Sequence, residues 1–377
     1  MGPAAFVDYA PAARLALLAL VIALVPLSWL WLRRRGSDTR ARLAAITALT
    51  LFLTFDLVVF GSFTRLTDSG LGCPDWPGCY GEASPIGAAG DIDAAQRALP
   101  DGPVTWHKAW IEMVHRYLAM TVGVLILVTA AASIAARRQL PHSLAWPLAT
   151  LGWVVVQGLF GRYTVTLKLY PAVVTLHLLG GLALLALLAL QHEAYRARPI
   201  AATAALQRLA SLAMVVLVAQ IALGGWVSTN YAVLACSGFP ACNGQWWPSL
   251  DAAQGFTLLR ELGRAGHGGY LSFDALVAIQ MAHRGFAVVA TLVLALLAWR
   301  LWLGEATRRF GVALALLLAA QLASGLSNVV LGWPIAAAIG HSAGAAALML
   351  LLTLLLARLR GATAAAARQS THEVAAA

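Results

Sequence analysis

The chain has 377 residues, of which 60% are hydrophobic and 11% are charged, and its mean hydropathy is +0.76. A soluble domain carries about 25% charged residues, so this composition excludes a soluble globular fold, whose surface so few charges could not cover. The net charge of +10 does not indicate a nucleic-acid partner, because the basic residues gather in short links between apolar stretches. The main solvent of this protein is therefore expected to be the lipid bilayer.

Nine apolar stretches approach the roughly 20 residues that a helix needs to cross a bilayer. Strand-like alternation is absent, so we predict an all-α polytopic membrane protein and not a barrel. The stretches lie at 12–32, 43–62, 111–136, 144–162, 171–191, 206–228, 280–303, 309–331 and 335–357. The first is followed by the basic triplet at 33–35, whereas a cleavable signal is preceded by basic residues. It is therefore predicted to be retained as an extra N-terminal transmembrane helix.

Every second link between the stretches is basic. Arginine is concentrated at 33–42, 137–138, 196–208 and 300–309 and again in the tail after 357, whereas the long loop before residue 111 is rich in acidic residues. Basic links mark the cytoplasmic side of a membrane. Nine crossings then place the N-terminus outside and the C-terminus in the cytoplasm, in a membrane of the bacterial inner-membrane type.

All four cysteines fall in two long outer loops, as Cys73 with Cys79 and Cys236 with Cys242. An even number confined to the oxidising face predicts two local disulfides. A metal site is the alternative, but neither loop offers a second pair of ligands at the spacing that zinc sites use.

An internal repeat relates the two loops and the helices around them. An offset of 164 pairs Gly61 with Gly225, Gln157 with Gln321, Gly161 with Gly325 and His177 with His341. Because each repeat contains four helices, the repeats run in the same direction through the membrane. We predict two pseudo-symmetric four-helix bundles. The expected parts are the extra helix with its basic link (1–42), an N-terminal half (43–195), a C-terminal half (196–360) and a cytoplasmic tail (361–377).

Four histidines lie inside apolar helices: His115, His177, His283 and His341. Each follows its helix's outer end by five or six residues, roughly 8 Å at 1.5 Å per residue. Each half has one on its second and one on its fourth helix, so the two imidazoles share one depth and could hold a haem iron from both faces. Ordinary hydrogen-bonded bundle histidines are the alternative, but intramembrane ionisable groups are costly and mark functional sites. Zinc would need three or four ligands per site.

Charged residues next to these histidines differ between the halves. Arg116 and Arg284 each follow a histidine and could pair with haem propionates, or could extend to the membrane surface. Glu112 lies one turn before His115, whereas Gln280 occupies the equivalent position before His283. A carboxylate beside a haem can accept or donate protons, so we predict the reacting site in the first half. The alternative is that Glu112 only favours the start of its helix.

Two motifs resemble those of the heme A synthase family. The run GSFTRLTDSGLGCPDWPGC at 61–79 is similar to the first-loop signature of that family, and EMVHR at 112–116 resembles its Glu-x-x-His-Arg motif. His177, the second cysteine loop, His283-Arg284 and His341 follow in the family's order. The resemblance covers residues 43–357.

The resemblance implies a specific reaction and two haem sites. The C-terminal half would bind a permanent haem b through His283 and His341, with the iron between them. The N-terminal half would bind the substrate haem O near His115 and His177, with Glu112 close to the reacting edge. A ring methyl of haem O would be oxidised to a formyl group by successive hydroxylations, giving haem A for haem-copper terminal oxidases. The implied partner is haem O synthase, the protohaem farnesyltransferase.

Other readings of the sequence remain open at this stage. A di-haem b-type electron-transfer subunit would use four axial histidines equally well, and the parallel repeat also occurs in secondary transporters. Family members have eight helices, so the first helix could serve as a docking surface, an insertion aid or an unrelated appendage. The sequence does not identify the electron donor, the source of the formyl oxygen, redox activity of the first-loop cysteines or the formation of a homo-oligomer.

Overall fold

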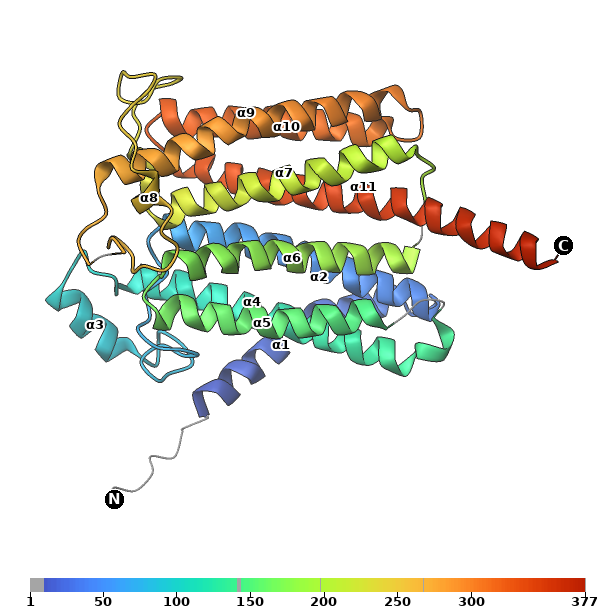
Figure 1. Ribbon diagram of the computed structural model, residues 1–377. Coiled ribbons are helices and arrows are strands. Elements are labelled where there is room, and N and C mark those ends of the chain that lie inside the picture. Colours follow the sequence, from blue (N-terminus) through green and yellow to red (C-terminus); the bar gives the residue numbers. More distant parts are fainter. Residues whose placement is uncertain (1–9, 141–143, 197, 267, 377) are drawn as a thin grey trace. The chain divides into compact units, whose positions relative to one another are not determined.

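The computed structural model describes residues 10–140, 144–196, 198–266 and 268–376, with side chains up to residue 360. Within these residues the protein contains eleven α-helices, two short 3-10 helices and no β-strand (Figure 1). The predicted all-α fold is confirmed.

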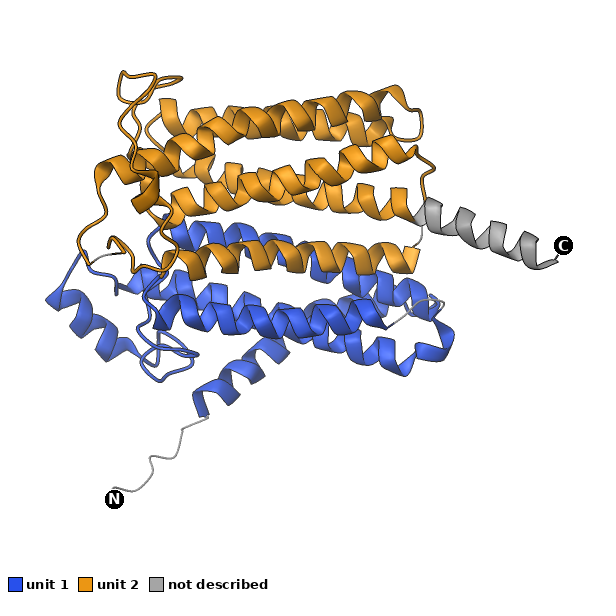
Figure 2. Ribbon diagram, viewed as in Figure 1, with its two compact units in different colours: residues 1–169 blue, residues 170–377 orange. Residues whose placement is uncertain are grey.

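The chain divides into two compact units, residues 1–169 and 170–377 (Figure 2). In the first unit α4 is central, because α1, α2, α3 and α5 all pack against it. The helices of this unit are α1 (Ala10–Arg33), α2 (Thr39–Leu66), α3 (Ala89–Ala98), α4 (Trp106–Ala135), η1 (Arg137–Gln139) and α5 (Ala145–Thr166).

In the second unit α7 packs against α6, α9 and α11, and α10 packs against α9 and α11. Figure 1 shows α7, α9, α10 and α11 running side by side. The helices of this unit are α6 (Pro171–Arg196), α7 (Ala204–Thr229), η2 (Ala232–Leu234), α8 (Ala252–Gly255), α9 (Phe273–Leu303), α10 (Arg308–Val330) and α11 (Ile335–Ala376).

Helix α6 belongs to the second unit by its contacts, although the repeat assigns it to the first half. It packs against α7 and α11, and the two guanidinium nitrogens of Arg358 donate to the Glu193 carboxylate at 3.0 and 2.8 Å. The boundary between the two units falls between residues 169 and 170. The boundary between the two predicted halves falls between residues 195 and 196. The repeat describes equivalence in sequence and the units describe packing, so the two four-helix halves stay a prediction.

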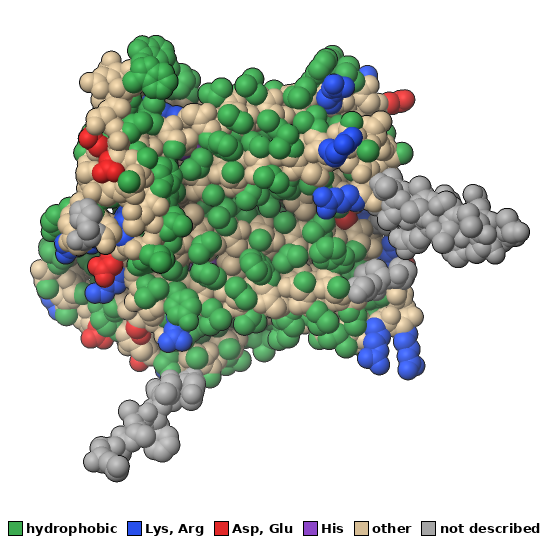
Figure 3. Space-filling model, in the orientation of Figure 1, with side chains coloured by type: hydrophobic (Ala, Val, Ile, Leu, Met, Phe, Trp, Pro, Cys, Tyr) green, Lys and Arg blue, Asp and Glu red, His purple; other side chains and the backbone are tan. Residues whose placement is uncertain are grey.

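Eight of the described helices are long and apolar enough to cross a membrane: α1, α2, α4, α6, α7, α9, α10 and α11. Helix α5 covers the predicted stretch at 144–162 but is not among the eight, because Gln157 and Arg162 lower its hydropathy. Hydrophobic side chains cover the flanks of the helices, and Lys and Arg gather at their ends (Figure 3). The protein is therefore a multi-pass membrane protein.

The extra helix α1 is part of the first unit. Leu15, Ala19 and Ala23 are all fully or almost fully buried, and their spacing of four places them on one face. Leu15 packs in one cluster with the Cys73 and Cys79 side chains. Helix α1 thus covers the first cysteine loop as well as α4.

Polar caps define where several helices begin. Oδ1 of Asp38 accepts a hydrogen bond from Ala41 N at 2.6 Å, and Oγ of Ser272 accepts one from Ala275 N at 3.2 Å. Such side chains satisfy backbone N–H groups that have no partner within the helix. The Ser272 cap fixes the start of α9 and with it the depth of His283.

Candidate functional site

Both predicted cysteine pairs form disulfides. Cys73 is bonded to Cys79 with an S–S distance of 2.06 Å, and Cys236 is bonded to Cys242 at 2.02 Å. The prediction of two local disulfides is confirmed, in preference to a metal site.

The two disulfide loops end in the same backbone turn. Tyr80 and Gly81 have φ values of 50° and 74°, and Asn243 and Gly244 have values of 53° and 77°. This left-handed region favours glycine and asparagine. An isolated antiparallel bridge closes each turn, between Cys79 and Glu82 and between Cys242 and Gln245. The two units therefore present closely similar loops next to their His-Arg helices.

In the first unit Glu112 and Arg116 tie the first loop to α4. Glu112, only 4% exposed, accepts a hydrogen bond from Cys73 N at 2.8 Å and forms an ion pair with Arg116. Arg116 NH1 donates to the backbone oxygens of Asp75 at 2.9 Å and Pro77 at 3.2 Å. The pair holds the loop by its backbone, so the loop's position depends on both charges.

In the second unit Arg284 makes the corresponding contacts. Its guanidinium donates to the backbone oxygens of Cys236 at 3.2 Å and Gly238 at 3.1 Å. Gln280 is as buried as Glu112, at 4% exposed, and donates to the Val233 oxygen at 3.4 Å. Nε of Arg284 is buried without a hydrogen-bond partner among the described residues. One N–H is thus left for an anion, and the predicted pairing of both arginines with propionates stays a prediction.

His283 on α9 is held by α7. Nε2 of Gln220 lies 3.1 Å from Nδ1 of His283 and 3.2 Å from its backbone oxygen. A Cβ added at Gly224 would lie 2.9 Å from Cε1 of His283. Only glycine lets the ring approach α7 this closely.

His341 on α11 is held by α10 in a similar way. Its Nδ1 lies 3.2 Å from the Gln321 backbone oxygen and 3.2 Å from Oγ of Ser324. Its Nε2 lies 3.4 Å from the Gln321 amide nitrogen. A Cβ at Gly325 would lie 2.9 Å from Cε1 of His341. Each ring is therefore fixed by a glutamine and a glycine four residues later on the neighbouring helix.

The contacts of His341 determine which of its ring nitrogens carries the proton. A carbonyl oxygen accepts a proton and an amide nitrogen donates one, so His341 carries its proton on Nδ1 and presents the Nε2 lone pair. Nδ1 of His283 faces the Gln220 amide nitrogen, which is a donor. A hydrogen bond from Nδ1 to a carbonyl is the usual second contact of a metal-binding histidine. A haem iron can take two imidazoles as its axial ligands, and the residue types of His283 and His341 fit that pair.

The two histidines predicted for the first half lie in different units. His115 on α4 stacks on Phe60 of α2, with ring centroids 6.4 Å apart, and a Cβ at Gly61 would lie 3.0 Å from its Nε2. His177 lies on α6, and its Nδ1 is buried without a hydrogen-bond partner among the described residues. The pairing of His115 with His177 around haem O stays a prediction.

Sequence reasoning missed the side chains that orient the C-terminal histidines. Gln220, Gly224 and Ser324 were not singled out, although Gln321 and Gly325 appeared in the repeat. A glutamine in an apolar helix followed by glycine four residues later is the signal that could have identified them. An intramembrane amide needs a partner, and the glycine makes room for one.

Comparison with known proteins places the chain in a family. The sequence profile described as cytochrome oxidase assembly protein matches residues 44–353. A protein of Shewanella oneidensis named heme A synthase is 39% identical over 312 residues, covering 82% of this chain and 94% of the relative. A heme A synthase of Caulobacter vibrioides is 30% identical over 340 residues, with coverages of 83% and 94%. One of Shouchella clausii is 28% identical over 301 residues, with coverages of 77% and 86%. The chain therefore belongs to the cytochrome oxidase assembly protein family, COX15-CtaA.

Proposed function

We propose that this membrane protein is a heme A synthase, an oxidoreductase that converts a ring methyl of haem O to a formyl group by successive hydroxylations. The observation that carries the proposal is the 39% identity to the heme A synthase of Shewanella oneidensis over 94% of that protein's length. The product, haem A, would serve the assembly of haem-copper terminal oxidases, in agreement with the family's description.

The C-terminal site is proposed to hold a permanent haem b between His283 and His341. When bound, this haem supplies one-electron transfer to the reacting site. Gln220 and Gln321 hold the two imidazoles against α7 and α10. Gly224 and Gly325 keep the rings close to α7 and α10. Arg284 keeps one buried N–H that a propionate could accept.

The N-terminal site is proposed to bind haem O near His115 and His177, with Glu112 as the acid-base group. Glu112 and Gln280 occupy equivalent positions and are equally buried. The presence of a carboxylate in the first unit and of an amide in the second therefore does not follow from a difference in burial. The Glu112 carboxylate is paired with Arg116, and a carboxylate at this position can accept or donate a proton. The same pair fixes the first loop against α4, so the loop would be held in place during the reaction.

The charge pattern of the links indicates on which side of the membrane the two sites lie, and the substrate indicates which enzyme would supply it. Basic links place the N-terminus outside and the C-terminus in the cytoplasm, so both haem sites would lie near the outer face. Haem O synthase would supply the substrate, because its product is the haem on which this reaction acts. Electrons would reach haem O through the C-terminal haem from a donor still to be identified.

The proposal can be tested by extracting haem from membranes that co-express this chain with a haem O synthase. Wild type is expected to yield haem A. Glu112→Ala is expected to lower that yield by roughly 10²–10⁴-fold, the usual contribution of a positioned acid or base. Gln280→Ala is the matched control, because it makes a similar truncation at equal burial. Haem O left unconverted by the wild-type chain would contradict the synthase assignment. Equal losses in both variants would contradict the role of Glu112.

A further inference from the structure

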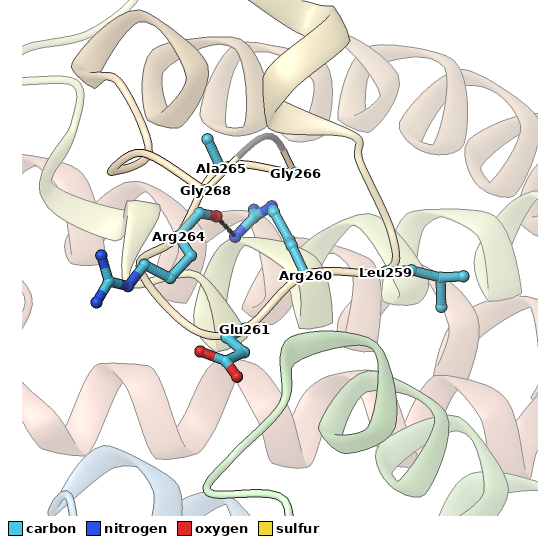
Figure 4. Close-up of a pocket in the computed structure, with 7 residues that line it drawn as sticks. All are labelled: Leu259, Arg260, Glu261, Arg264, Ala265, Gly266 and Gly268. Atoms are coloured by element: carbon cyan, nitrogen blue, oxygen red, sulfur yellow. Dashed lines mark hydrogen bonds between the residues drawn. The ribbon is translucent and has the colours of Figure 1, made fainter.

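Arg260 is a buried cation in the loop between α8 and α9. It is only 3% exposed, and its guanidinium donates to Oδ1 of Asn230 at 2.5 Å and to the Arg264 backbone oxygen at 3.3 Å (Figure 4). Its Nε is buried without a hydrogen-bond partner among the described residues. Glu261 is the next residue, but its carboxylate points away from the guanidinium (Figure 4).

This arginine lacks a counter-ion in the described part of the chain, where no carboxylate lies within ion-pair distance of it. Burial lowers the pKa of its guanidinium from the usual value, which reflects the cost of removing the charge from water. Neutral oxygens satisfy two of its nitrogens and leave the charge uncompensated. A carboxylate or phosphate at Nε would satisfy both the buried Nε–H and the charge.

The position of Arg260 connects it to the C-terminal haem site. Its guanidinium lies over the ring of Trp226 on α7, 5.6 Å from the centroid. Trp226 packs in one cluster with Ile279 of α9, which is one helical turn before His283. Trp226 also comes two residues after Gly224, the glycine that lies against the His283 ring. Arg260 therefore lies one layer beyond the His283 imidazole, toward the loop ends of α7 and α9.

A haem carries its two propionates on one edge, so a haem held by His283 and His341 with that edge toward the loops would bring carboxylates into this layer. Arg260 and Arg284 are the two arginines of the second unit whose Nε atoms are buried without partners among the described residues. Two such donors match two carboxylates. The loop also borders a hollow of about 390 Å³, so a lipid phosphate is the other source of an anion.

We propose that Arg260 is a binding residue for a propionate of the haem held by His283 and His341. The proposal rests on the proposed function, which assigns haem b to these two histidines. The competing structural role is that Arg260 only ties the loop to Asn230.

The test uses the purified, haem-loaded full chain, with the midpoint potential of the haem followed against pH and the propionate bands followed by resonance Raman spectroscopy. In Arg260→Gln the midpoint potential should fall, because loss of a nearby positive charge favours the ferric haem. The pH at which the potential inflects should rise, because the propionate loses the cation that favours its ionised form. Arg260→Lys should restore part of both changes. Arg264→Gln is the matched control, since that exposed residue of the same loop stacks on Tyr270 and should leave both readouts unchanged.

Several outcomes would overturn the proposal. Unchanged potential and propionate bands in Arg260→Gln would leave only the structural role. A change that appears only when anionic lipid is added to delipidated protein would assign Arg260 to a headgroup phosphate. If Arg260→Gln does not accumulate, Arg260→Lys decides, since an unshifted propionate band then contradicts binding. Wild-type protein without a bis-histidine haem spectrum, or His283→Ala that keeps it, would instead contradict the proposed function.

Discussion

Glycines beside the imidazoles set how closely each ring approaches its neighbouring helix. At Gly224 and Gly325 an added Cβ would lie 2.9 Å from a histidine ring carbon, which is shorter than an ordinary contact between carbon atoms. The ring would have to move away from Gln220 or Gln321, and the iron-binding nitrogen would move with it. These glycines are therefore constrained by the haem site as well as by helix packing.

Gly224→Ala and Gly325→Ala are each expected to lower the haem b content of the purified protein severalfold. The ratio of haem absorbance to protein measures the loss. Gly340→Ala is the matched control: it directly precedes His341, its added Cβ would meet nothing within 4 Å, and alanine favours a helix over glycine. Full haem content in Gly224→Ala and Gly325→Ala would mean that the rings do not depend on these contacts.

At the scale of single elements, α1 is a packed component of the first unit. Leu15 is fully buried against the first disulfide loop, whereas Leu17 is 62% exposed on the same helix. Leu15→Ala is expected to destabilise the protein by about 2 kcal/mol, the lower end of the range for buried leucines, because lipid lessens the transfer contribution. Leu17→Ala should have little effect. Thermal unfolding in detergent compares the two, and equal melting temperatures would show that α1 does not support the loop.

The two disulfide loops differ in the residues after the shared turn. The second loop has Trp246 and Trp247, which are 68% and 91% exposed, where the first has Ala83 and Ser84. Tyr117 donates to the Ala83 backbone oxygen at 2.8 Å, so the first loop is tied down at this point. Because exposed side chains contribute little to folding, replacing both tryptophans by the Ala-Ser of the first loop should change stability by less than about 0.5 kcal/mol. A large drop in melting temperature would show that the tryptophans pack in the folded protein.

Features that depend on a particular type of residue could be predicted from the sequence, whereas contacts made to the backbone could not. The cysteine pairs could be recognised in the sequence because the chain has only four cysteines. The four histidines could be recognised because ionisable residues are rare in apolar helices. The ties from Glu112 and Arg116 to the first loop end on backbone N–H and C=O groups, which every residue has. The packing of α6 in the second unit includes the ion pair between Glu193 and Arg358, which are 165 residues apart. A repeat identifies equivalent helices but not their packing partners.

At the scale of the whole molecule, α5 decides the topology. Its 22 residues would span about 33 Å at 1.5 Å per residue, enough for a hydrocarbon core of about 30 Å, although its hydropathy does not place it among the eight membrane-spanning candidates. If α5 did not cross, the basic links at 196–208 and 300–309 would lie on the opposite side from the one at 137–138. That arrangement would contradict the charge rule for cytoplasmic links.

The placement of the polar residues explains how α5 could cross. Gln157 is buried within the protein and so avoids lipid, and Arg162 is close to the end of the helix at Thr166, where its side chain can extend to the interface. Green fluorescent protein fused after residue 139 should therefore fluoresce in the cytoplasm, and alkaline phosphatase fused after residue 168 should be active outside. An inactive phosphatase after residues 168 and 230, with an active one after residue 200, would show that α5 does not cross. In that case α6 would run outward from the cytoplasm, the basic link at 196–208 would lie outside, and His177 would no longer share the depth of His115.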